Sequence, residues 1–192
     1  VEALRDALLA ISGKLDRSRG GKTLQRLGLV SIHSDMIDLD APSPYMRRSV
    51  YLPLIRDSLG ESPEENAAHG MRTAFDGASP NLVCGARTTS TIPAQALFLM
   101  NSEFLAQQAR ATALRLAKAY PHDSERNRVD RLFELALARP ARDGEANAAL
   151  QLVAALRREA EQSEAERAES EVAAWSGLCQ AVFACNEFLF LR

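Results

Sequence analysis

Residues 91–119 read TIPAQALFLMNSEFLAQQARATALRLAKA, and this stretch decides the fold class of the chain. Thr91 is a typical helix-capping residue, Pro93 suits a first helical turn, and Pro121 follows where the pattern stops. The apolar residues between them recur at the spacing of a helix face. We therefore predict one long helix from Pro93 to about Ala119, in a mainly α-helical protein.

Three further helices are predicted downstream. Their starts are expected at a cap on Asp123 or Ser124, near Asp143, and at about Val172. Residues 157–171 are almost all Arg, Glu, Ala, Ser and Gln, a composition that fits a solvated helix extension or a mobile hinge, of which the helix extension is favoured. On the last helix, the apolar stripe predicts five inward-facing side chains: Val172, Trp175, Leu178, Val182 and Phe183.

The N-terminal third is mixed in character. Residues 1–12 carry a helical stripe, and a second helix is predicted from Pro63 to near Phe75. Residues 47–55 contain β-branched and aromatic side chains typical of a short strand, which could pair with residues 30–32. The prediction is a helical bundle with a small two-stranded β-ribbon. It forms a single domain over residues 1–192, with a mixed segment over 1–62 and a helical core over 63–192.

Composition excludes several classes of function. The 192-residue chain has a formal net charge of −2, whereas a protein that binds nucleic acid through its charge needs clustered positive residues. Only 6% of the residues are aromatic, so platforms for stacking bases or sugars are scarce. No apolar run approaches the roughly 20 residues that span a bilayer. The chain opens with Val1 in an amphipathic stretch and without a signal peptide, so we expect a piece of a larger protein.

No local motif for a metal or a cofactor is present. Cys84, Cys179 and Cys185 form no CxxC or CxxCH pair, so neither a zinc site nor haem attachment is expected. We expect the three to be small buried side chains without a bond within the chain, although Cys84 could reach one of the others. The histidines at positions 33, 69 and 122 are far apart and lack metal-binding spacing.

The strongest candidate site precedes the helix at Pro93. Arg87 and four consecutive hydroxyl residues lead into a helix N-terminus, where free N–H groups and the helix dipole favour an anion or carboxylate. A ligand or partner site would therefore be lined by Arg87, Thr88, Thr89 and Gln95. The structural alternative, which we favour, is that Arg87 pairs with Asp76, the hydroxyls cap the helix, and Gln95 and Asn101 hold neighbouring backbone.

A second, weaker candidate is the arginine pair before Tyr51. Arg47 and Arg48 could form a small basic face. An arginine pair beside a strand is more often a solvated edge that blocks aggregation. The second interpretation is favoured.

Four blocks of the sequence together resemble a known family. They are RRSVYLP (47–53), NLVCGARTTSTIPAQALFLMN (81–101), LFELALARP (132–140) and WSGLCQAVFACNEF (175–188). They resemble the domain of unknown function 1553, the C-terminal domain of large planctomycete and verrucomicrobial proteins. The resemblance spans nearly the whole chain and implies that the first part of the family domain lies before Val1.

The resemblance implies an exported parent protein that often carries an N-terminal c-type cytochrome domain and a companion domain, and for which polysaccharide processing has been suggested. It supplies no catalytic residues. We expect no haem or other cofactor in this chain itself. The leading function is a scaffold or interaction domain for the other domains of the parent. The alternative is a ligand-binding or catalytic module for a saccharide, with the Arg87 loop as its site.

Overall fold

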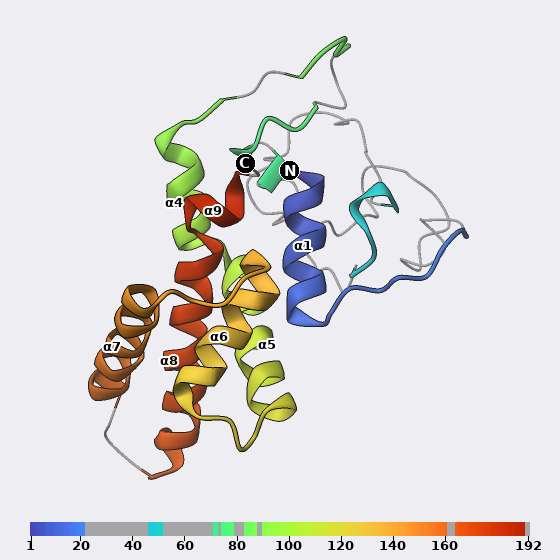
Figure 1. The fold of residues 1–192 in the computed structure, drawn as a ribbon. Coiled ribbons are helices and arrows are strands. Elements are labelled where there is room, and N and C mark those ends of the chain that lie inside the picture. Colours follow the sequence, from blue (N-terminus) through green and yellow to red (C-terminus); the bar gives the residue numbers. More distant parts are fainter. Residues whose placement is uncertain are drawn as a thin grey trace. The chain divides into compact units, whose positions relative to one another are not determined.

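The computed structural model of the protein describes residues 1–21, 46–51, 71–72, 74–78, 83–87, 90–160 and 164–190, and these residues are mainly helical (Figure 1). None of the described helices is long and apolar enough to cross a membrane. The helices are α1 (Glu2–Ser12), the short 3-10 helix η1 (Ser49–Tyr51), α4 (Pro93–Asn101), α5 (Glu103–Ala119), α6 (Glu125–Leu137), α7 (Asp143–Ala160), α8 (Glu164–Phe183) and α9 (Asn186–Leu189).

The chain divides into two compact units. Residues 1–7 and 15–98 form the first, and residues 8–14 and 99–192 form the second. Each unit is described by itself below.

Helix α8 is the centre of the second unit, where it packs against α5, α6, α7 and α9 (Figure 1). Of the five side chains that the apolar stripe places inward, Trp175, Leu178, Val182 and Phe183 are buried, whereas Val172 is only half-buried. A Cβ atom added to Gly177 would lie 2.6 Å from the Leu156 Cδ1 atom of α7. The lack of a side chain at Gly177 therefore allows α7 and α8 to approach closely.

The predicted long helix over 93–119 is two helices. Helix α4 ends at Asn101, and Ser102 is the N-cap of α5, where its Oγ atom accepts a hydrogen bond from the Leu105 backbone N–H at 3.3 Å. A capping serine satisfies one of the backbone N–H groups that a new helix leaves without an intrahelical partner. The apolar spacing continues across the break, which is why periodicity alone missed it.

The other helix boundaries in the second unit follow local sequence signals with one exception. Ser124, rather than Asp123, is the N-cap of α6, and its hydroxyl accepts from the Asn127 backbone N–H at 3.2 Å. Helix α7 begins at Asp143, as predicted. Helix α8, however, begins at Glu164 instead of near Val172, so the polar residues 164–171 are a helix extension.

A network of ion pairs links α6, α7 and α8. Arg157 of α7 lies 2.6 Å from the Glu125 carboxylate of α6, and its Nε and Nη2 atoms donate to Glu171 of α8 at 2.6 and 2.8 Å. Glu171 also accepts from Trp175 Nε1 at 2.8 Å, while the Arg128 guanidinium lies over the indole ring. The indole N–H, the only polar group of the buried Trp175 side chain, therefore has a hydrogen-bond partner, as is usual for a buried indole.

A second ion-pair network lies where α6 ends. Arg139 donates from Nη1 and Nη2 to both carboxylate oxygens of Glu145 in α7, at 2.7 and 2.8 Å. It also donates from Nε and Nη2 to Glu187 in α9, at 2.7 and 2.6 Å. The Arg139 guanidinium, assisted by the Arg142 N–H, lowers the pKa of Glu145 to about 2. Arg139 thus binds carboxylates in the first turns of both α7 and α9.

The last turns of α1 belong to the second unit and pack on α5. Leu8, Leu9 and Ile11 are buried. Arg115 of α5 donates from Nη1 to the carbonyl oxygens of Ala10 and Ile11, at 3.0 and 2.6 Å. These C-terminal carbonyls have no partner within their own helix, so an arginine is well suited to satisfy them.

In the first unit the predicted β-ribbon is not confirmed. Ser49–Tyr51 is a 3-10 helix, and the described part of the chain contains no strand, only a single bridge between Asp16 and Arg47. Residues 30–32 and 52–55, the rest of the predicted ribbon, lie outside the described residues, as does most of the helix predicted from Pro63. β-Branched composition did not decide the local structure because Ser49 binds Asp6 of α1 through both its backbone N–H and its hydroxyl.

The three cysteines are all free. Cys179 is buried, which raises the pKa of its thiol, and Cys185 is half-buried. Cys84 is exposed, so the expectation that all three are buried is wrong for Cys84.

Our first prediction concerns the centre of α8. Trp175→Ala should lower the free energy of unfolding by about 3–5 kcal/mol, because it removes a large buried side chain and leaves a cavity. Trp175→Phe should cost less, since most of the apolar volume remains. Urea unfolding measures both, and equal stability of Trp175→Ala and wild type would contradict this packing.

The second prediction concerns the close approach at Gly177. Alanine normally stabilises a helix by up to about 1 kcal/mol relative to glycine. Gly177→Ala should not show this gain, because its Cβ displaces Leu156, and should regain it in a Leu156→Ala background. Gly144→Ala is the matched control, since a Cβ at Gly144 meets no atom within 4 Å. Additivity of the Gly177 and Leu156 changes would show that the two residues do not constrain each other.

Candidate functional site

Arg87, the centre of the predicted ligand site, is bound to a carboxylate within the first unit. Its Nη1 and Nη2 atoms donate to the two carboxylate oxygens of Glu2, at 2.8 and 3.0 Å. The Arg87 side chain is 47% exposed and that of Glu2 is 38% exposed. Thr88 and Thr89 lie outside the described residues, so their part in the predicted site stays a prediction.

The expected pair between Arg87 and Asp76 is wrong. Asp76 instead binds Ser90, accepting from its backbone N–H at 2.6 Å and from its hydroxyl at 2.8 Å. Asp76 has a backbone φ of 53°, in the left-handed region that few non-glycine residues adopt. Nearness in sequence suggested Asp76 as the partner of Arg87, whereas the true partner, Glu2, is 85 positions away.

Gln95 is buried and holds backbone, as the structural alternative predicts. Its Nε2 atom donates to the Ser90 carbonyl oxygen at 3.1 Å. Asp76, Ser90 and Gln95 therefore form one chain of hydrogen bonds that fixes the loop to the start of α4. Arg87 and Gln95 bind different partners in this unit. Each of the two side chains connects one segment of the unit to another.

The ion pair with Arg87 changes the acidity of Glu2. Chiefly through its hydrogen bonds to the carboxylate, the Arg87 guanidinium lowers the pKa of Glu2 to about 2 from an ordinary 4.5. The carboxylate therefore stays charged over the whole physiological pH range. A proton donor or acceptor for catalysis near pH 7 needs a pKa close to that value, so this pair is unsuited to such a role.

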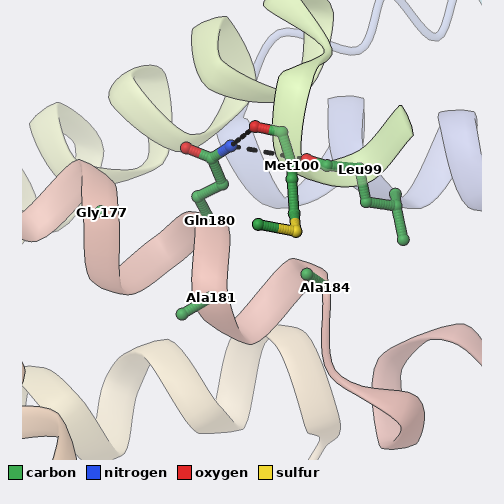
Figure 2. A pocket seen from close by; sticks show the side chains of 6 residues that line it. All are labelled: Leu99, Met100, Gly177, Gln180, Ala181 and Ala184. Carbon is green, nitrogen blue, oxygen red and sulfur yellow. Dashed lines mark hydrogen bonds between the residues drawn. The ribbon is translucent and has the colours of Figure 1, made fainter. Parts of the chain in front are cut away.

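A groove of about 220 Å³ in the second unit has a different character. It is lined by residues from the end of α4, from the C-terminal half of α8 and from the turn just after α8: Leu99, Met100, Gly177, Gln180, Ala181 and Ala184 (Figure 2). None of these six side chains is titratable. The groove is therefore suited to binding apolar groups rather than to acid–base chemistry.

Gln180 keeps the polar groups of this groove satisfied. Its Nε2 atom donates to the Met100 and Leu99 carbonyl oxygens, at 3.0 and 3.4 Å, and Figure 2 shows both bonds. These carbonyls belong to the last turn of α4, where no intrahelical partner exists. Because these carbonyls are bonded to Gln180, the surface beside them is formed by the Met100 side chain and by the small residues of the groove.

Met100 is the prominent apolar side chain of the groove. It is 66% exposed, whereas its neighbour Leu99 is only 1% exposed. Figure 2 shows the Met100 side chain extending from α4 toward α8, beside Ala181 and Ala184. Methionine is flexible and polarisable, which suits it to contact with varied apolar surfaces.

Sequence reasoning missed this groove. The signal in the sequence was a methionine in an apolar helix, together with small residues at 177 and 181 of another helix and at 184 just after it. That signal could not be interpreted before the two helices were placed together. Within the described residues, no group of three or more His, Cys, Asp or Glu side chains is arranged to hold a metal ion.

The Glu2–Arg87 pair generates the third prediction. Because the folded pKa of Glu2 is lowered, its contribution to stability is present above pH 4.5 and is lost as pH falls toward 2. Arg87→Ala should return the pKa of Glu2 toward 4.5 and, because the pair is exposed, change the stability at pH 7 only slightly. Carboxyl NMR titration measures this pKa. Glu145, whose pKa is lowered to about 2 by Arg139, is the control that should not move.

A family model matches most of the chain. Residues 1–153 match PSD1, a protein of unknown function (DUF1553). No curated protein and no solved structure matches the chain. The match covers well over half of the 192 residues and includes the blocks at 47–53, 81–101 and 132–140. The chain therefore belongs to the PSD1 family of unknown function, DUF1553.

Proposed function

We propose that this chain is an interaction module, and that the groove between α4 and α8 receives apolar side chains of another protein domain. The observation that carries the proposal is Met100, which is 66% exposed at the edge of a groove whose lining residues, apart from Gln180, are apolar. Removing apolar surface from water favours association by roughly 25 cal/mol per Å². A single exposed apolar residue is ordinary, but one beside a groove is a typical contact point.

The proposed partner is a further domain of the same polypeptide, exported with this chain to the periplasm or cell surface. The resemblance to planctomycete proteins with an N-terminal c-type cytochrome domain supports this expectation. Intramolecular contact also suits a small groove, because a tethered partner is present at a high effective concentration. The haem of such a parent would lie outside this chain.

A saccharide function at the Arg87 loop has less support. Both Nη atoms of Arg87 are engaged by Glu2, and the single tryptophan of the chain is only 2% exposed. A sugar site commonly needs an accessible aromatic face beside free polar groups. The bonds of Arg87 and Gln95 therefore favour the structural interpretation, and the family match names no reaction.

The fourth prediction tests the interaction module in the intact parent protein. A photo-reactive phenylalanine analogue at Met100 should cross-link to an apolar segment of another domain, which mass spectrometry identifies. The same analogue at Leu114, a 46% exposed residue of α5, is the control and should not capture that segment. Equal cross-linking from both positions, or from neither, would contradict the proposal.

A substitution gives the energetic test. Met100→Glu should weaken domain association about tenfold, which corresponds to about 1.4 kcal/mol, by placing a charge against an apolar surface. Because the side chain is exposed, the stability of the module itself should change by no more than about 0.5 kcal/mol. Leu114→Glu again serves as the control.

A further inference from the structure

Arg47 is a buried arginine in the first unit. Its exposed fraction is only 3%, whereas the side chain of the adjacent Arg48 is 62% exposed. Arginine is almost never fully buried unless it is paired, because removing its charge from water is costly. The burial of the Arg47 guanidinium therefore needs a structural explanation, whereas the exposed Arg48 side chain needs none.

One of the three guanidinium nitrogens of Arg47 is fully used by the fold. Its Nη2 atom donates to the Ser18 and Gly20 carbonyl oxygens, at 2.9 and 2.8 Å. The guanidinium carbon lies 3.9 Å from the centre of the Tyr51 ring, and the Tyr51 hydroxyl accepts from the Gly20 N–H at 3.2 Å. Arg47 is thus held rigidly, with one face of its plane covered by Tyr51.

The other two nitrogens lack acceptors. Nε and Nη1 of Arg47 are both buried, and neither finds a hydrogen-bond acceptor among the described residues. A buried donor without a partner typically costs about 1–3 kcal/mol, and more when it is charged. The carbonyl oxygens of Ser18 and Gly20 stabilise the cation but do not neutralise its charge.

The nearby carboxylates bind other groups. Asp6 accepts from the Ser49 N–H and hydroxyl at 2.7 and 2.8 Å, and lies within 4 Å of Arg5 and Arg48. Asp16 accepts from the N–H and hydroxyl of Ser18, at 2.8 and 3.0 Å. No ion pair joins either of them to Arg47 in the part of the chain that the structure describes. Among the described residues, the Arg47 guanidinium therefore has no carboxylate of its own.

We propose that Arg47 is the anchor of a binding site for a small carboxylate. A carboxylate supplies the missing negative charge and the missing acceptor together, and it binds in the plane of the guanidinium rather than against the face that the Tyr51 ring covers. Nε and Nη1 donate along different edges of that plane. One carboxylate therefore occupies one edge, and a water molecule satisfies the nitrogen at the other.

Formate, the smallest carboxylate, is the probe. Thermal unfolding is measured with increasing sodium formate against sodium chloride at equal ionic strength. In the wild type, formate should raise Tm saturably, by on the order of 5 °C at a hundredfold excess over its Kd, and chloride should not. Arg47→Met should abolish this rise. Arg48→Met, which removes the exposed neighbouring charge, should retain it.

A second measurement keeps the proposal testable if Arg47→Met does not fold. The Arg47 Nε–H resonance of the wild-type protein can be identified in NMR spectra by its contact with the Tyr51 ring. Saturable movement of this resonance with formate, while Arg48 Nε–H stays in place, supports the site. Equal effects of formate and chloride on Tm, or an Arg47 resonance that does not respond to formate, would overturn it.

Discussion

The packing of α8 against its neighbours is the interaction on which the second unit depends. Trp175, Leu178 and Phe183 place apolar surface on several sides of one helix, and Gly177 removes the one side chain that would hold α7 away. Polar contacts then join the surrounding helices to one another and to α8. Ion pairs of Arg157 and Arg139 connect helix ends around it, and Gln180 uses the polar side of α8 to satisfy carbonyls of α4.

Local physical signals predicted much of this architecture. The N-cap at Ser124, the start of α7 at Asp143 and the inward face of Trp175 follow from residue type and spacing alone. The break at Ser102 was missed because apolar spacing continues through it. The predicted start of α8 near Val172 is wrong because it rests on the first apolar residue, whereas the favoured helix extension agrees with the helical residues 164–171, which pairs such as Arg110 with Glu169 stabilise.

The site residues were harder to predict, since their partners are distant in sequence. Arg87 was expected to bind a carboxylate, and it does, but the carboxylate belongs to Glu2 at the opposite end of the first unit's sequence. The sequence pattern predicts a solvated edge at Arg47, but this side chain is buried and contacts Tyr51 and the carbonyls of Ser18 and Gly20. Composition identifies which side chains need partners, but only the fold determines which groups meet.

The ion pairs of Arg139 make the attachment of α9 depend on the salt concentration. Helix α9 has only one turn, and its Glu187 is joined to Arg139 through exposed atoms. Attraction between exposed charges weakens as ions accumulate around them, and its range falls to about 3 Å in 1 M salt. The contact of Phe188 with Phe183 does not weaken in this way, since apolar association is not screened. In a concentrated salt medium the aromatic contact therefore contributes a larger share of the attachment of α9 than it does in a dilute medium.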